Sequence, residues 1–308
     1  MPDDTPDVDA LQRRVAELEA ELERWRTWRP PGHFYSPIPD LDTLRPREDE
    51  LFDCSLRALP GIEARVEQQL ALMADFARLY RDQPWHDAPT DGRRYGFLND
   101  QYSYSDAIFL FCMLRTARPA RVIEVGSGHS SAAMLDTADL FLDSDGSRVD
   151  FTFIDPYPDR LHSVLRPEDH DRVRILDTPV QDVPLETFDA LQANDVLFID
   201  STHVSKTGSD VNRLYFEVLP RLAPGVLVHI HDVHYPFEYP REWVFEGRAW
   251  NEVYLLRAFL LFNRGFEIVC MNTALEHYQP AWFREHMPLC LENPGGSIWL
   301  RRLPDATP

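Results

Sequence analysis

A buried strand that runs straight into a glycine turn constrains the fold of this chain more than any other feature. Residues 121–125 are mostly apolar, Gly126 and Gly128 follow at once, and Ser130 lies in the helical pattern that comes next. Glycines permit a tight turn and a close backbone approach, so the N-terminus of the following helix can face a ligand. Glycine-containing turns also occur for packing alone, so the turn by itself leaves the ligand open.

The region from residue 96 onward alternates strand and helix patterns. We predict strands at 121–125, 151–155, 172–176, 195–200, 225–231, 266–271 and 297–302, and helices at 103–116, 130–141, 209–222 and 249–263. Such alternation predicts an α/β, Rossmann-like fold, with helices on both faces of a mostly parallel, seven-stranded sheet. The last two strands are expected to pair as a long hairpin.

The N-terminal segment has a different pattern. Apolar residues recur there at alternating spacings of three and four, namely Val8, Leu11, Val15, Leu18, Leu22 and Trp25. This heptad seam predicts a helix over 1–30, which either lies on its own domain or joins subunits as a coiled coil. We favour a homo-oligomer formed through this helix and other contacts. Residues 31–95 are expected to form an accessory cap, and 96–308 the main domain.

Charge and cysteine content narrow the class of partner. The chain has 51 acidic and 31 basic residues, a formal net charge of -20, which would repel a phosphate backbone and disfavours nucleic acid as a partner. Its four cysteines are widely spaced and read as reduced thiols. An acidic N-terminus and the lack of an apolar run of membrane length predict a cytoplasmic protein without a membrane partner.

Polar residues at the strand ends indicate which cofactor is bound. Asp155 closes the second strand, where a carboxylate can accept both hydroxyls of a ribose. Gln181 and Asp182 follow the third strand, at the expected adenine edge. A nicotinamide-binding turn favours a third glycine where this chain has Ser131. An NAD-dependent oxidoreductase therefore stays an alternative, weakened by Ser131 and by the Gln181-Asp182 pair.

With these residues, the segment 96–302 resembles the class I S-adenosylmethionine-dependent methyltransferases, in particular the catechol O-methyltransferase group. The resemblance implies S-adenosylmethionine as cofactor and a seven-stranded sheet of the Rossmann type. Residues 198–240 are also very similar to a loosely characterised methyltransferase family with Ile-Asp-Ser-Ser-His and His-Ile-His-Asp segments. The expected cofactor-binding residues are Glu124, Gly126, Gly128, Ser130, Asp155, Gln181, Asp182 and Tyr102, the last within a lid at 99–102.

The resemblance also implies a metal, with departures. In the catechol group the fourth strand ends in an Asp that binds a divalent metal, which matches Asp200. Three residues later the group has a catalytic lysine, where this chain has His203. The group's fifth strand ends in Asp-Asn, whereas here Asp232 is followed by Val233. We expect Asp200, His231 and Asp232 to hold the metal, with His234 as an alternative to His231.

The chemistry of methyl transfer requires an aligned nucleophile and a group that takes its proton. His203 is the expected general base, because imidazole titrates near neutral pH, with Asp200 beside it. The alternative is that His203 only packs the following turn, and that Asp200 and Asp232 only accept backbone N–H groups at helix starts. Imidazole with carboxylates suits Fe, Mn or Zn, and carboxylates alone suit Mg. His229 is expected to be a hydrogen-bonded interior residue.

These features together predict an O-methyltransferase acting on a hydroxyl of a small molecule, a sugar or a natural-product intermediate. An N-methyltransferase or carboxyl methyltransferase on the same fold is the close alternative, and a non-catalytic scaffold is a third. The aromatic loop at 235–240, with Trp243, forms either a substrate wall or a surface cluster. Trp250, Asn251 and Glu252 open the next helix and fit either role.

Overall fold

The structure is a computed structural model that describes residues 8–24, 28–55, 58–90, 92–144 and 146–305. The chain forms two compact units. The larger contains residues 53–240 and 250–308, and the smaller contains residues up to 52 together with 241–249. The predicted methyltransferase site lies wholly in the larger unit.

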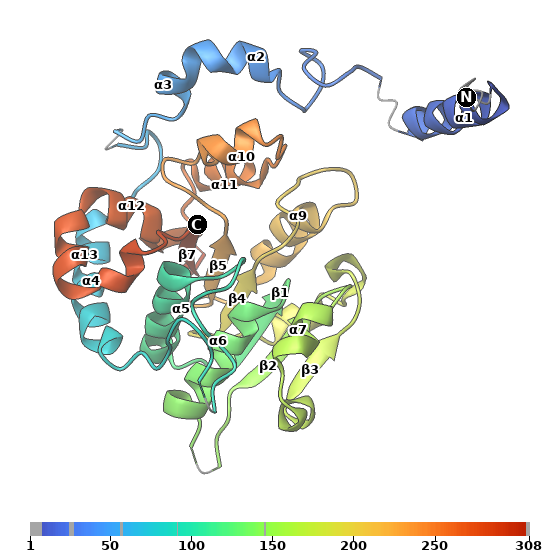
Figure 1. Cartoon of the computed structure of the whole chain (residues 1–308). Coiled ribbons are helices and arrows are strands. Elements are labelled where there is room, and N and C mark those ends of the chain that lie inside the picture. The colour runs from blue at the N-terminus through green and yellow to red at the C-terminus, as the bar shows by residue number, and fades with distance from the viewer. Residues whose placement is uncertain (1–7, 25–27, 56–57, 91, 145, 306–308) are drawn as a thin grey trace, which may run out of the picture. The chain divides into compact units, whose positions relative to one another are not determined.

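A seven-stranded sheet forms the centre of the larger unit (Figure 1). Its strands are β1 Arg121–Val125, β2 Asp150–Ile154, β3 Val173–Leu176, β4 Val196–Ile199, β5 Leu227–His231, β6 Phe266–Met271 and β7 Ser297–Arg302. Their order is β3-β2-β1-β4-β5-β7-β6. The first five strands are parallel, and β7 runs antiparallel to both β5 and β6. The predicted α/β, Rossmann-like sheet and its final hairpin are confirmed.

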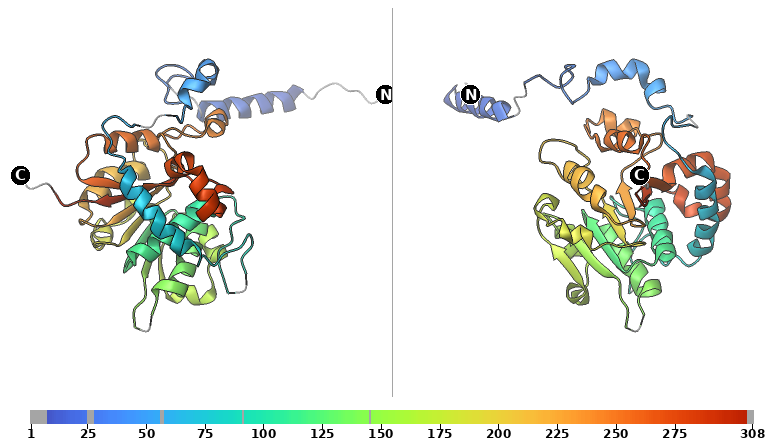
Figure 2. Two further views of the ribbon diagram at one scale, coloured as in Figure 1. Left: turned by 90° about the vertical axis from the view of Figure 1, so that its left-hand side faces the viewer. Right: turned by 180° about the vertical axis from the view of Figure 1, so that it is seen from behind.

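Helices cover both faces of this sheet, and the central strands β4 and β5 are buried throughout, in all four residues of β4 and all five of β5. The helices of this unit are α4 Val66–Tyr80, α5 Tyr104–Ala117, α6 His129–Thr137, α7 Asp159–Val164, α8 Glu186–Asp189, α9 Asp210–Arg213, α11 Glu252–Leu260, α12 Asn272–Tyr278 and α13 Pro280–His286. Both views in Figure 2 place α4, α12 and α13 beside α5.

The helix predicted within residues 31–95 is α4, which begins at Val66 and joins the core of the larger unit. Its Met73 and Phe76 are buried, and the Phe76 ring meets Phe109 of α5 edge-on at 5.6 Å between centroids. Phe109 and nine other residues of α5 are buried, so this helix has apolar neighbours on all sides. Together α4 and α5 anchor the segment that leads into β1.

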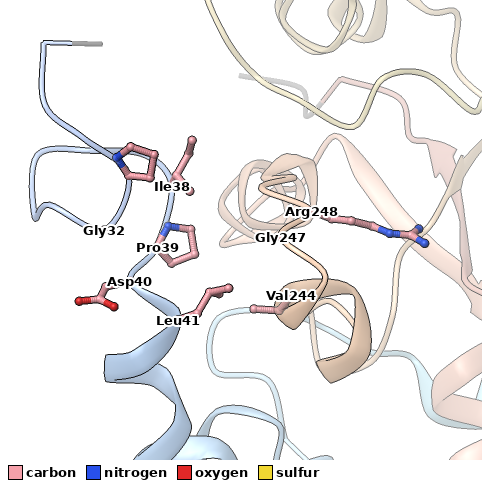
Figure 3. A pocket seen from close by; sticks show the side chains of 9 residues that line it. Gly32, Ile38, Pro39, Asp40, Leu41, Val244, Gly247 and Arg248 are labelled. Atoms are coloured by element: carbon pink, nitrogen blue, oxygen red, sulfur yellow. The ribbon is translucent and has the colours of Figure 1, made fainter. Parts of the chain in front are cut away.

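The smaller unit contains α1 Val8–Arg24, α2 Leu41–Leu44, α3 Glu48–Leu51 and α10 Arg241–Phe245. The Arg241 guanidinium of α10 donates to Glu48 of α3 at 2.6 Å. A pocket in this unit is lined by Ile38, Pro39, Leu41, Val244 and other residues (Figure 3). On α1 the predicted apolar seam from Val8 to Leu22 is 41–69% exposed, and Trp25 lies outside the described residues. No helix in the described ranges is both long and apolar enough to cross a membrane.

Candidate active site

The glycine turn lies against the end of β4. Gly126 has a φ of +81°, and a Cβ added to it would lie 1.7 Å from the backbone oxygen of Asp200. The N–H of Gly126 donates to Ile154 at the end of β2, and the N–H of Asp200 donates to Val125. Only glycine satisfies both the left-handed backbone and the close approach. The turn, the end of β2 and the end of β4 therefore meet at one edge of the sheet.

Glu124 supports this turn from inside the protein. It is fully buried and accepts hydrogen bonds from the hydroxyls of Ser130 and Ser131. Ser131 in turn accepts the N–H of Gly128 at 3.0 Å. Burial, with the charges of nearby carboxylates, raises the pKa of Glu124 to about 8. The protonated side chain holds the turn and the first turn of α6 together, and a cofactor contact by Glu124 or Ser130 stays a prediction.

The structure places the other predicted cofactor residues around the same edge. Asp155 accepts the backbone N–H and the hydroxyl of Ser127 at 3.0 and 3.1 Å. Gln181 donates to the carbonyl of Gly208 at 3.0 Å, and Asp182 is exposed beside it. These residues are thus available at the rim, and their contacts with a cofactor stay predictions.

Tyr102 of the predicted lid points inward. Its side chain is 2% exposed, and its hydroxyl donates to the carbonyl of Asp106 at 3.1 Å. Its ring centroid lies 5.1 Å from that of His231. Tyr102 therefore forms part of the floor beside β5 in this structure, and a role in binding the cofactor stays a prediction.

His203 lies at the centre of a group of carboxylates. Its Nε2 lies 3.4 Å from Oδ1 of Asp200 and 3.2 Å from Oδ2 of Asp232. Its Nδ1 lies 2.9 Å from Oε2 of Glu252. Burial opposes a charge on the ring, but the bonds to Asp200 and Glu252 and the charges of Glu252 and Asp232 raise the pKa of His203 well above its usual range. In this arrangement the ring is an imidazolium.

Asp200, His231 and Asp232 form the predicted cation-binding group. One donor atom from each lies within 4.8 Å of the others. The ring of His231 is 5% exposed, and its buried Nδ1 has no hydrogen-bond partner among the described residues. Burial would raise the pKa of Asp200, but the charges of His231 and His203 and a bond to His203 lower it. Two carboxylates and an imidazole are a donor set that fits Mn, Fe or Zn.

His229 and His234 lie apart from this group. His229 is interior as predicted, but its predicted hydrogen bonds are wrong: neither ring nitrogen has a partner in the described part of the chain. The ring stacks on Phe198 at 3.9 Å and meets Trp299 at 4.8 Å, so aromatic neighbours take the place of hydrogen-bond acceptors. Burial, with the neighbouring His231, lowers the pKa of His229 well below its usual range. Burial, together with His231 and His203, lowers the pKa of His234 to about 3, so this ring is neutral.

Two residues that the sequence left undecided also touch the site. The Trp250 ring lies 4.6 Å from the ring of His203, and Glu252 holds its Nδ1. Glu252 is the first residue of α11 and Trp250 comes two residues before it, so both follow Asp232 and the short helix α10 in the chain. In the sequence, Glu252 could be recognised only as an acidic residue in the first turn of a predicted helix. Acidic residues are common at that position in helices that form no site.

Comparisons with known proteins bear on the family of this chain. A family model described as a methyltransferase domain matches residues 123–233. An uncharacterized protein of Archaeoglobus fulgidus is 32% identical over 172 residues, which are 54% of this chain and 74% of that protein. The chain belongs to the class I S-adenosylmethionine-dependent methyltransferases. The matched segment of this methyltransferase runs from β1 to just beyond β5, so it includes the glycine turn, Asp200, His203 and Asp232.

Solved structures of low sequence identity are similar to this methyltransferase. The O-methyltransferase TomG from Streptomyces achromogenes is 14% identical, with 85% of this chain and 96% of that chain covered and a TM-score of 0.40. An O-methyltransferase from Bacillus cereus is 12% identical, with 84% and 97% covered and a TM-score of 0.40.

Proposed function

We propose that this methyltransferase transfers the methyl group of S-adenosylmethionine to a hydroxyl of a small molecule, a sugar or a natural-product intermediate. The observation that carries the proposal is that Asp200 contacts both the glycine turn and His203. Its backbone lies against the glycine turn, and its side chain faces Nε2 of His203. A cofactor on the turn and a hydroxyl beside His203 would therefore lie next to each other, as an in-line displacement requires.

Each group of residues has its own part in this proposal. Gly126 and Gly128 let the backbone approach the cofactor, and Asp155 accepts the hydroxyls of its ribose. Gln181 and Asp182 contact the adenine, and His203 accepts the proton of the substrate hydroxyl. The carboxylates of Asp200 and Asp232 lie close together, and a positive charge next to both of them offsets their repulsion. A proton on Nε2 of His203 supplies this charge when no cation is bound. With a cation there, Nε2 is available to accept the substrate proton.

Asp200, His231 and Asp232 would hold a divalent metal. Such an ion, when bound, supplies a Lewis acid that lowers the pKa of a coordinated hydroxyl. The Nε2 of His231, 3.6 Å from Oδ1 of Asp232, and the mixed donor set support its presence. An acceptor amine would not need this help, so the same group favours O-methylation over N-methylation.

Removal of divalent metal tests this part of the proposal. We expect a strong chelator to abolish most methyl transfer to hydroxyl acceptors, and added Mn²⁺ or Zn²⁺ to restore it. The measurement is transfer of labelled methyl from S-adenosylmethionine to a panel of sugars, nucleotide sugars and phenols, with amines and carboxylic acids in parallel. Transfer that continues at the full rate in chelator, or products found only among amines or carboxylic acids, would contradict metal-assisted O-methylation.

We also propose that the methyltransferase is a homo-oligomer assembled in part through α1. The helix exposes a continuous seam of five described apolar residues, a pattern typical of helices that pair. Deleting residues 1–28 is expected to lower the mass in solution measured by light scattering. The double change Leu11→Glu and Leu18→Glu should do the same, whereas Ala16→Glu with Ala20→Glu adds the same charge off the seam and should not. If the deletion and the Leu11→Glu/Leu18→Glu variant both keep the number of subunits of the wild-type protein, assembly through α1 is contradicted.

A cytoplasmic location is part of the same proposal. Cys112, Cys270 and Cys290 are free thiols, and all three are buried. Burial raises the pKa of the Cys112 and Cys270 thiols, so neither forms a reactive thiolate at neutral pH. Free buried thiols are typical of proteins that work in a reducing compartment.

A further inference from the structure

Glu252 has no part in the function proposed above, yet its carboxylate is buried against His203. It opens α11, its side chain is 2% exposed, and its Oε2 lies 2.9 Å from Nδ1 of His203. Burying a carboxylate is costly unless it is paired. The contact with His203 is therefore a strong constraint on both side chains.

The backbone around His203 is held by the same helix. The carbonyl of His203 accepts the N–H groups of Asn251 and Glu252, each at 3.1 Å. The side chain of Asn251 accepts the N–H of Ser205 at 2.6 Å and donates to its carbonyl at 3.2 Å. These four bonds hold His203 at a φ of +59°, a left-handed conformation that a residue with a side chain rarely adopts. The start of α11 thus fixes both the position and the orientation of the ring.

This geometry also fixes which ring nitrogen faces Asp200 and Asp232. A carboxylate is only an acceptor when ionised, so Nδ1 must carry the proton that it shares with Glu252. The other nitrogen, Nε2, then faces Asp200 and Asp232, where the proposed chemistry takes place. A buried carboxylate on Nδ1 orients the ring and stabilises its charged form, as in other histidine-based active sites.

We infer that Glu252 is a positioning residue of this methyltransferase, which binds Nδ1 of His203 and orients the ring so that Nε2 is the nitrogen that exchanges a proton with the substrate. The catalytic meaning of the inference rests on the proposed function. The hydrogen bond itself does not, and it can be measured in the full-length protein without an acceptor. The ring of Trp250 packs against that of His203, tilted by 42° with 4.6 Å between the centroids.

Proton NMR of the whole chain tests the hydrogen bond. We expect the Nδ1 proton of His203 to resonate far downfield of the backbone amides, to exchange slowly and to disappear in His203→Ala. It should also disappear in Glu252→Ala and move upfield in Glu252→Gln, where a neutral amide replaces the carboxylate. Glu186→Ala, an exposed acidic residue at the start of α8, is the matched control and should leave it unchanged. A resonance that stays in place in Glu252→Ala and Glu252→Gln would overturn the inference.

Steady-state kinetics test whether Glu252 positions His203 for catalysis or only stabilises the fold. In Glu252→Gln we expect kcat to fall about 10–10²-fold, with an unchanged KM for S-adenosylmethionine. The loss is smaller than the rate enhancement of about 10²–10⁴-fold that a general base provides, because His203 itself is still present. Glu252→Asp should recover part of the loss. Equal loss of cofactor affinity would overturn the positioning role. If the wild-type protein methylates no hydroxyl acceptor, the proposed function fails, whereas the NMR result still decides whether Glu252 binds Nδ1 of His203.

Discussion

Changing His203 to alanine is expected to lower the turnover number about 10²–10⁴-fold, the usual contribution of a group that accepts a proton in the transition state. Affinity for S-adenosylhomocysteine should stay nearly the same, because the ring of His203 contacts the side chains of Asp200, Asp232 and Glu252 and not the glycine turn. Turnover is measured with the best hydroxyl acceptor, and affinity by calorimetry.

A surface histidine gives the control for this change. His162 is exposed on α7, and His162→Ala should leave both quantities unchanged. Loss of cofactor affinity in His203→Ala, to the same degree as turnover, would move His203 out of the proton-transfer role. It would then support the alternative that this residue only caps or packs the turn at 205–208.

Changing Gly126 to alanine is expected to have the largest effect on cofactor binding. The new Cβ would lie 1.7 Å from the backbone oxygen of Asp200, so the turn or the end of β4 must move. Overpacking of this kind costs about 1–3 kcal/mol, and a left-handed backbone adds about 1–2 kcal/mol. We expect a lower melting temperature and a loss of affinity for S-adenosylhomocysteine of at least about tenfold, equivalent to about 1.4 kcal/mol.

The variant Gly247→Ala distinguishes the effect of backbone strain from the effect of the steric collision. Gly247 also has a positive φ, +89°, but no atom lies within 4 Å of a Cβ added there. Gly247→Ala therefore introduces the backbone strain without the collision and should bind the cofactor normally. If Gly126→Ala behaves like Gly247→Ala in both melting and calorimetry, the contact between the turn and Asp200 does not shape the cofactor site.

The strand ends could be predicted from the sequence because short-range rules govern them. Buried apolar runs identified the strands, and parallel strands bring their carboxyl ends to one edge. That placed Asp200 at the end of β4 beside Asp232 at the end of β5, and the structure has donor atoms of both within 4.8 Å of His231. The hairpin of β6 and β7 followed from the same pattern.

The contact between His203 and Glu252 could not be predicted in this way, since 49 residues and one further strand separate them. It depends on where α11 packs over the end of the sheet, which no local spacing encodes. The environment of His229 was missed for a related reason. Strand alternation gave its side of the sheet, but the aromatic rings of Phe198 and Trp299, from neighbouring strands, decide that its nitrogens have no acceptor.

The carboxylates around the glycine turn have a consequence for cofactor exchange. Asp155 and Asp200 both lie at this edge, and Asp232 lies beside Asp200 across His203. The sulfur of S-adenosylmethionine carries a positive charge, which methyl transfer removes. A negative field at this place attracts the cofactor before the reaction and has no such hold on the neutral sulfur afterwards. We therefore expect the spent cofactor to be held less tightly than the fresh one, so that the same acidic residues that assemble the site also help to empty it.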